Sequence, residues 1–252
     1  MQLSKFISQI IQDSVLWIKT QNKIVVLFTL LIYIYLIGIR IYNIFNYPFV
    51  EEDEGTYMLQ AWSIKETDKI AYYTYWYDHS PMGWMVIAFF SIFLGGITGL
   101  GNPINTGRVI ILIMHIISLI VIHRSVLNLT DGNKIAGLSA LLFFGATNIG
   151  LFYQRRILLD NILIFFLALS FYILTLKKQK LEWAAVAGFL FGIGVLSKES
   201  GIFFLPAFVI YFLLRLKGRF RILYFFIFNS IVGSLLFLYL MLAVLKNRIV
   251  TK

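Results

Sequence analysis

Seven apolar segments of the sequence are each close to the length that a helix needs to cross a membrane, which is about 17–25 residues. They are residues 24–39, 109–123, 135–152, 161–176, 183–197, 201–214 and 222–245. Hydrophobic residues make up 60% of the chain and charged residues 13%, whereas soluble domains average about 45–50% and about 25%. A water-soluble globule could not bury that much apolar surface. We therefore predict an all-α fold, a polytopic membrane helix bundle of about seven transmembrane helices, with residues 1–252 as a single domain.

Basic residues outnumber acidic residues by 22 to 12, which gives a net charge of +10. In a soluble protein this excess would suggest nucleic-acid binding, but in a membrane protein Lys and Arg collect in the cytoplasmic loops. No basic stretch with interleaved aromatic residues occurs in a polar segment. We therefore expect membrane lipids as partners and no nucleic acid. The sequence has no cysteine, which excludes disulfides, thiolate metal sites and cysteine nucleophiles.

The N-terminal segment, residues 1–23, does not have the pattern of a cleavable signal peptide, because Lys5, Asp13 and Lys19 interrupt any apolar core. Its pattern is more typical of an amphipathic helix that lies on the cytoplasmic surface of the membrane. With a cytoplasmic N-terminus, the chain reaches the outer side of the membrane after residues 24–39. Residues 42–107 then form one long outer loop if the apolar stretch 82–98 does not cross the membrane.

The distribution of basic residues decides between the two topologies. If residues 82–98 do not cross, nine basic residues of the later loops are cytoplasmic and four are outer, which is the expected asymmetry. The nine are Arg124, Lys134, Lys177, Lys178, Lys180, Arg215, Lys217, Arg219 and Arg221, and the four are Arg108, Arg155, Arg156 and Lys198. Gly95 and Gly96 also suit a helix that stops and turns. We predict that residues 82–98 form a juxtamembrane or re-entrant helix on the outer face.

The outer loop 42–107 carries an acidic cluster, residues 51–54, just before a helix-like run from Gly55 to Lys65. Carboxylates at a helix N-terminus suit the helix dipole, so capping is one interpretation. The other is chemistry, because carboxylates in a partly dry cleft can act as a general base or bind a metal. Asp78 and His79 follow an aromatic run, residues 72–77, that either forms an interfacial belt or lines a carbohydrate pocket. Asp78-His79 either opens a helix before Pro81 or adds polar groups to the same cleft.

Two further polar islands fall on the outer side in the preferred topology. In the first, Arg155 and Arg156 either extend toward the membrane surface or bind a phosphate, and Asp160 either caps a helix or joins the site. In the second, Lys198 either makes an ion pair that links helices or has a functional role. Only this topology places these candidate site residues on one face: Asp53, Glu54, Asp78, Arg155, Arg156, Asp160 and Lys198.

Four motifs in order carry a resemblance to a known family: DEGTYMLQAW from Asp53, DHSP from Asp78, RRILLD from Arg155, and GFLFGIGVLSK ending at Lys198. The chain resembles the N-terminal half of the C-type glycosyltransferases, and most of all glycosyltransferase family 39, with its protein O-mannosyltransferases and lipid A aminoarabinose transferases. The resemblance covers about residues 24–215 and implies a long first outer loop with juxtamembrane helices.

The resemblance also implies roles for individual residues. Asp53 would be the catalytic carboxylate, with Glu54 as its neighbour and Asp160 as the second acidic site residue. Asp78 and His79 would shape the cleft for the substrate, and Arg155, Arg156 and Lys198 would bind the lipid phosphate. Some relatives hold a divalent metal near these acids and others do not, so no cofactor is assigned from the sequence.

The chain departs from the family pattern in two ways. Ser80-Pro81 stands where relatives have a Pro-Pro pair, and the sequence stops at Lys252 where relatives continue into further membrane helices. We therefore expect a C-terminally incomplete domain, and a partner chain that supplies the missing helices is one interpretation.

The expected function is transfer of a sugar, with inversion, from a polyprenyl-phosphate donor to an acceptor protein or glycolipid at the outer face of the plasma membrane. A transporter or lipid flippase that uses the same intramembrane charges, and a non-catalytic assembly subunit, are the alternatives. No glycine-rich phosphate loop for a nucleotide follows a predicted strand.

Overall fold

The computed structural model describes residues 23–71, 80–177 and 179–245. Within these ranges the secondary structure is helical without strands, which confirms the predicted all-α membrane helix bundle. The predicted amphipathic segment 1–23 (apart from Lys23), the aromatic run 72–77 and the candidate residues Asp78 and His79 lie outside the described residues. The helices are α2 (Lys23–Ile41), α3 (Glu52–Thr67), α4 (Met82–Ile92), α5 (Pro103–Leu129), α6 (Lys134–Ala146), α7 (Asn148–Tyr153), α8 (Leu159–Thr175), α9 (Leu181–Ser197), the 3-10 helix η1 (Glu199–Phe204), α10 (Leu205–Arg215) and α11 (Gly218–Leu245).

The chain divides into two units, residues 1–42 and residues 43–252. Within the first unit, α2 is a helix of 19 residues whose mean hydropathy of 2.5 suits a membrane span. Its sequence is apolar almost throughout, as expected for a helix that crosses a membrane.

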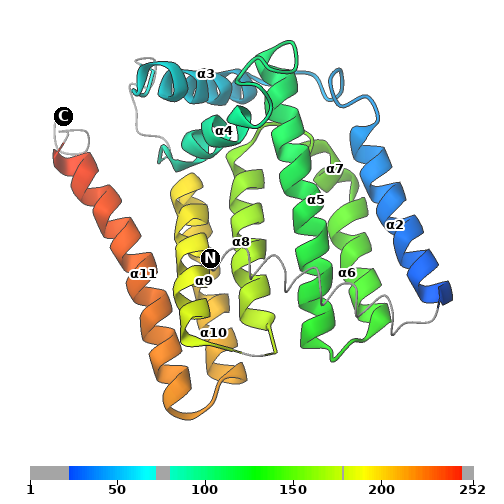
Figure 1. Ribbon diagram of the computed structural model, residues 1–252, viewed down its shortest axis with the longest axis vertical. Helices are drawn as coiled ribbons and strands as arrows, with labels where there is room; N and C mark the ends of the chain where they lie inside the picture. The colour runs from blue at the N-terminus through cyan, green and yellow to red at the C-terminus, as the bar shows by residue number, and fades with distance from the viewer. Residues whose placement is uncertain (1–22, 72–79, 178, 246–252) are drawn as a thin grey trace. The chain divides into compact units, whose positions relative to one another are not determined.

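The second unit is built around the helices α5, α6, α8, α9, α10 and α11, which follow one another in alternating directions, and the short helix α7 continues the path of α6 (Figure 1). Of these, α5 and α11 are long and apolar enough to cross a membrane by length and composition, whereas α6, α8 and α9 are shorter apolar helices. Two predicted crossings are interrupted. The segment 135–152 breaks at Thr147 between α6 and α7, and the segment 201–214 begins as the 3-10 helix η1.

Helices α3 and α4 lie across one end of this bundle and not along it (Figure 1). They pack on each other, and α4 also contacts α5, α8 and α9. With 11 residues, α4 is about 16 Å long, whereas the hydrocarbon core is about 30 Å thick. The helix ends at Ile92, and both Gly95 and Gly96 then adopt positive φ angles of 84° and 102°. The predicted stop and turn at these glycines is therefore confirmed.

Small residues let the bundle helices approach closely. A Cβ atom placed on Gly188 of α9 would lie 2.7 Å from the backbone oxygen of Phe228 on α11, and one on Gly192 would lie 2.5 Å from the side chain of Leu235. In lipid, where no hydrophobic effect drives helices together, such close packing is a main source of association. Gly188 therefore sets the distance between α9 and α11.

We expect Gly188→Ala to destabilise the bundle, because the added methyl group meets backbone that must move. Gly233→Ala on α11 is the matched control, since a Cβ there has no neighbour within 4 Å and alanine favours helix by up to about 1 kcal/mol over glycine. The measurement is the thermal unfolding midpoint of each purified variant in detergent. A midpoint for Gly188→Ala at or above that of Gly233→Ala would contradict the prediction.

Candidate functional site

A buried ion pair connects α3 to α5. The Arg108 guanidinium donates through Nε and Nη2 to Glu54 Oε1 and Oε2, each at 2.9 Å, and both side chains are 0% exposed. Two parallel bonds between a guanidinium and a carboxylate form a strong, geometrically specific contact. Gly107 makes the approach of the two helices feasible, because a Cβ there would lie 2.5 Å from the sulfur of Met58 on α3.

The same two side chains also hold the backbone around them. Arg108 donates to the carbonyl oxygens of Ile44 and Pro48, at 2.8 Å each. Glu54 accepts from the backbone N–H of Glu51 at 3.2 Å and from that of Ile157 at 3.1 Å. One ion pair therefore positions the loop before α3, the first turn of α3 and the segment between α7 and α8.

A pocket of about 450 Å³ opens where these segments meet, and we call it the acidic pocket. It is lined by Glu51, Asp53, Tyr153, Leu158 and Asp160. Asp53 lies in the first turn of α3 and Asp160 in the first turn of α8. Both helix N-termini carry partial positive charge, which favours carboxylates and other anions there.

Two cations at the acidic pocket are each held by one of its acids. Arg156 is 8% exposed on its side chain, pairs with Glu51, and lies 4.2 Å from the ring centroid of Phe152. Lys198, at the C-terminal end of α9, pairs with Asp160. In the described part of the chain, Asp53 is the pocket acid whose side chain has neither an ion pair nor a hydrogen bond.

Arg155 is buried beside the acidic pocket, and its guanidinium lies 5.4 Å from the ring centroid of Tyr47. Burial lowers the pKa of Arg155 below its usual value, and the nearby charge of Arg108 lowers the pKa further, whereas Tyr47 opposes the shift. Neither Arg155 nor Arg156 extends to the surface as a solvated side chain. Asn161 of α8 secures the segment that carries them by donating to the carbonyl oxygens of Tyr153 and Arg156, at 3.0 and 2.9 Å.

The structure thus brings most of the sequence-predicted site residues to one end of the bundle. Asp53 and Asp160 line the acidic pocket, Arg156 and Lys198 pair with its acids, and Glu54 is buried behind it. Their roles stay predictions. Asp78 and His79 fall outside the described residues, although the N–H of Ser80, directly after them, donates to the Glu199 carboxylate next to Lys198.

Glu54 is placed differently from its neighbour Asp53. The sequence resemblance groups the two residues as catalytic, but both oxygens of Glu54 accept hydrogen bonds and its side chain has no exposed surface. This geometry favours a positioning role over contact with substrate.

A metal ion is not assigned to this site. Across residues 23–71, 80–177 and 179–245, no group of three His, Cys, Asp or Glu side chains is arranged to hold one. Of the three carboxylates that line the acidic pocket, Glu51 and Asp160 already pair with cations.

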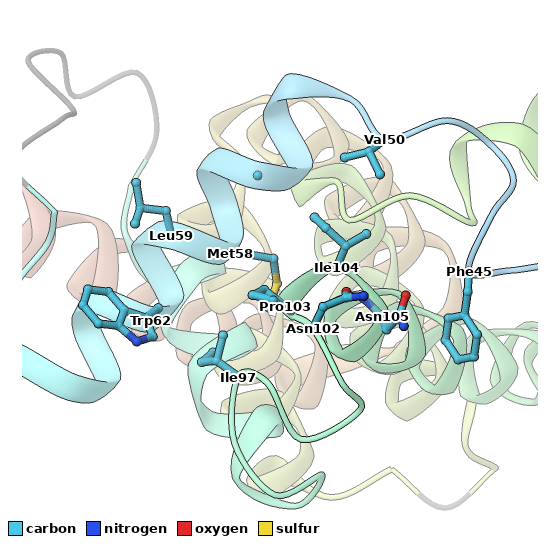
Figure 2. A pocket seen from close by; sticks show the side chains of 11 residues that line it. Phe45, Val50, Met58, Leu59, Trp62, Ile97, Asn102, Pro103, Ile104 and Asn105 are labelled. Carbon is cyan, nitrogen blue, oxygen red and sulfur yellow. The ribbon is translucent and has the colours of Figure 1, made fainter.

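A second pocket, of about 440 Å³, lies between α3 and the start of α5 (Figure 2). Figure 2 shows Met58, Leu59 and Trp62 of α3 facing Ile97 and the start of α5, with Phe45 and Val50 at its edge. Its lining includes no titratable side chain, whereas the acidic pocket is lined by three carboxylates.

Sequence reasoning did not assign three residues to the site: Arg108, Glu51 and Tyr153. Arg108 carried a usable signal, because a charged residue one turn into an otherwise apolar helix needs a buried partner. Glu51 could not be distinguished from the other acids of its cluster, and Tyr153 looks like an ordinary aromatic residue at the end of an apolar segment.

We expect Glu54→Gln to lower the free energy of unfolding by about 3–5 kcal/mol, because it leaves the buried charge of Arg108 without its counter-ion. Glu52→Gln is the matched control, since Glu52 is exposed in the same helical turn. The readout is the folded fraction after graded heating in detergent. Equal thermal stability of the two variants would show that the ion pair does not hold the site together.

A family model described as dolichyl-phosphate-mannose-protein mannosyltransferase matches residues 78–246, about two thirds of the chain. No curated protein and no solved structure matches the chain significantly. The matched region contains Arg155, Arg156, Asp160 and Lys198, whereas Asp53 precedes it. The order of motifs, the helical membrane fold and this match agree, and the chain belongs to the dolichyl-phosphate-mannose-protein mannosyltransferase family.

Proposed function

We propose that this chain transfers a sugar from a polyprenyl-phosphate donor to a hydroxyl group of an acceptor protein or glycolipid, in the acidic pocket. Membership of the family supports the class of reaction and the type of donor. The observation that carries the site assignment is Asp53. It is an exposed carboxylate in a pocket where the other two acids are paired with cations.

Asp53 is suited to act as a general base. A base must accept a proton from the attacking hydroxyl, so its carboxylate has to be reachable and uncommitted. Glu51 and Asp160 are committed to Arg156 and Lys198, and Glu54 is buried. Asp53 lies in the first turn of α3, directly before the buried Glu54. The contacts of Glu54 therefore fix the backbone position of Asp53.

Arg156 and Lys198 are suited to stabilise the leaving phosphate. Each is held at the acidic pocket by an ion pair, and a guanidinium and an ammonium both bind phosphate oxygens. Positioned cations lower the barrier when negative charge develops on a leaving group. The N-terminus of α8, where Asp160 lies, adds its positive dipole end.

The reaction balances without a further reactant. The acceptor oxygen forms a bond to the anomeric carbon, and the bond from that carbon to the phosphate oxygen breaks. The electron pair of the broken bond stays on the phosphate, next to Arg156 and Lys198, while the hydroxyl proton moves to Asp53. Attack opposite the leaving group inverts the anomeric centre, and the products are the glycoside and polyprenyl phosphate.

Glu54 and Arg108 act indirectly in this proposal. Their ion pair sets the positions of Glu51, Asp53 and the segment that contains Arg156 through the hydrogen bonds to Glu51 and Ile157. They are positioning residues, and Asp160 serves as the counter-ion that orients Lys198.

We expect Asp53→Asn to reduce sugar transfer by about 10²–10⁴-fold, the usual contribution of a general base. Thermal stability should be unchanged, because the Asp53 side chain makes no bond to the described residues. The assay follows labelled sugar from a polyprenyl-phosphate donor into acceptor, with membranes that contain the full chain.

Glu52→Gln is the control for loss of one acid from the same turn, and it should keep wild-type transfer. Full activity of Asp53→Asn would remove Asp53 as the base. Donor-independent movement of lipid across the membrane, without transfer, would instead favour a flippase.

The acidic pocket is proposed to face outward. The connections α5–α6, α8–α9 and α10–α11 gather at the opposite end of the bundle. These connections and the helix ends next to them carry nine of the basic residues, the same nine that the sequence predicts to be cytoplasmic. By the positive-inside rule that end is cytoplasmic.

The lack of cysteine makes this orientation simple to test. We expect a membrane-impermeant thiol reagent applied to intact cells to label Glu52→Cys, because Glu52 is exposed at the acidic end. Asp131→Cys, exposed in the α5–α6 connection, should react only after the cells are opened. The reverse pattern would place the acidic pocket inside.

A further inference from the structure

A short, strongly basic segment joins α10 to α11. Residues 215–221 read RLKGRFR and include no acidic residue. The basic residues of this segment, which we call the basic turn, are Arg215, Lys217, Arg219 and Arg221. Arg215 ends α10, and Gly218, with a φ angle of 58°, begins α11. Arg215, Lys217 and Arg219 are exposed, and Arg221 is half-buried.

The backbone of this segment is folded tightly, which brings the four cations close together. Arg221 Nε donates to the carbonyl oxygen of Leu216 at 2.6 Å, so the first turn of α11 folds back on the end of α10. Among the described residues, no carboxylate forms an ion pair with any of the four. Cations gathered in this way repel one another, and a bound anion would relieve the repulsion.

A shared carbonyl oxygen brings the α8–α9 connection to the same place. Leu174 O accepts a hydrogen bond from the Tyr211 hydroxyl at 3.0 Å and another from Gln179 Nε2 at 2.7 Å. Tyr211 lies one helical turn before Arg215, which interacts with the same hydroxyl. Lys177, two residues before Gln179, is exposed. The connection that carries Lys177 therefore lies beside the end of α10.

The two helices that flank the basic turn have exposed apolar side chains close to it. They are Ile210, Leu213 and Leu214 on α10, and Ile222, Leu223 and Phe226 on α11, each 48–79% exposed. Cations are thus followed directly by apolar surface on both helices. A phospholipid has the same order, an anionic phosphate joined to acyl chains, whereas a free phosphate ion would use only the cations.

We propose that the basic turn binds the phosphate of an anionic phospholipid, with the acyl chains along α10 and α11. Guanidinium and ammonium groups pair with phosphate oxygens, and clusters of Lys and Arg next to a membrane helix attract anionic lipids. The site is distinct from the acidic pocket, which lies at the opposite end of the bundle (Figure 1). The inference needs only that the bundle lies in a membrane.

The first test is native mass spectrometry of the full chain in detergent, titrated with dioleoyl phosphatidylglycerol or dioleoyl phosphatidylcholine. We expect phosphatidylglycerol to bind about tenfold more tightly or better, because its headgroup keeps a net negative charge. Millimolar inorganic phosphate should not displace it, because the ion has no acyl chains. Equal affinity for the two lipids, or displacement by inorganic phosphate, would overturn the proposal.

The second test removes two cations. Lys217→Gln combined with Arg219→Gln should weaken phosphatidylglycerol binding by about 25-fold, at about fivefold for each cation. Both side chains are exposed, so the fold should persist.

The matched control is Lys23→Gln combined with Lys134→Gln, which removes the same charge from the first residues of α2 and α6. This control should bind phosphatidylglycerol as the wild type does. An equal loss in both double variants would indicate a diffuse attraction to basic loops, and it would overturn a site at the basic turn.

The third test uses the wild-type chain, so it decides the question even if the variants fail to fold. The probe is phosphatidylglycerol with a diazirine in one acyl chain, in phosphatidylcholine nanodiscs. We expect mass spectrometry to map the adducts to the end of α10 and the start of α11. Adducts spread evenly over the lipid-exposed helices would overturn the proposal.

Sugar transfer is a separate question from this binding. Site-specific binding of phosphatidylglycerol by a chain that transfers no sugar would overturn the proposed function and leave this inference standing. Transfer without such binding would do the reverse.

Discussion

The ion pair between Glu54 and Arg108 is the contact on which the arrangement of the site depends. Two fully buried charges are costly unless every polar group is satisfied, and here the pair uses the surrounding backbone for that purpose. Arg108 donates hydrogen bonds to the carbonyl oxygens of Ile44 and Pro48. Glu54 accepts hydrogen bonds from the N–H groups of Glu51 and Ile157. Segments far apart in the sequence thereby meet at one end of the bundle.

The acidic pocket follows from this constraint. Its chemistry comes from an unequal use of its acids, because Glu51 and Asp160 hold cations while Asp53 stays uncommitted. In the proposed mechanism, Asp53 is therefore the acid left to act as the base, while Arg156 and Lys198 are held by other acids of the same pocket.

Much of this architecture was predictable from local patterns, and some was not. The apolar segments predicted an all-α bundle, and Gly95 and Gly96 predicted the end of α4. Both predictions succeed because a helix and its end depend on nearby residues alone. The break at Thr147 and the 3-10 start at Glu199 were missed, because hydropathy does not register where a helix changes its hydrogen bonding. Sequence also placed Asp53, Arg156, Asp160 and Lys198 on one face, but it could not assign their pairing.

The sequence by itself determined that this chain belongs in a membrane, which residues carry charge, and the order of the motifs that it shares with its family. Only the tertiary structure decided that the neighbouring acids Asp53 and Glu54 have different surroundings. Asp53 faces the pocket, whereas Glu54, one residue later, points about 100° around the helix and is buried against Arg108. The physical reason is that partners 54 and 103 residues away, at Arg108 and Ile157, make this choice, and no local pattern records contacts at that separation.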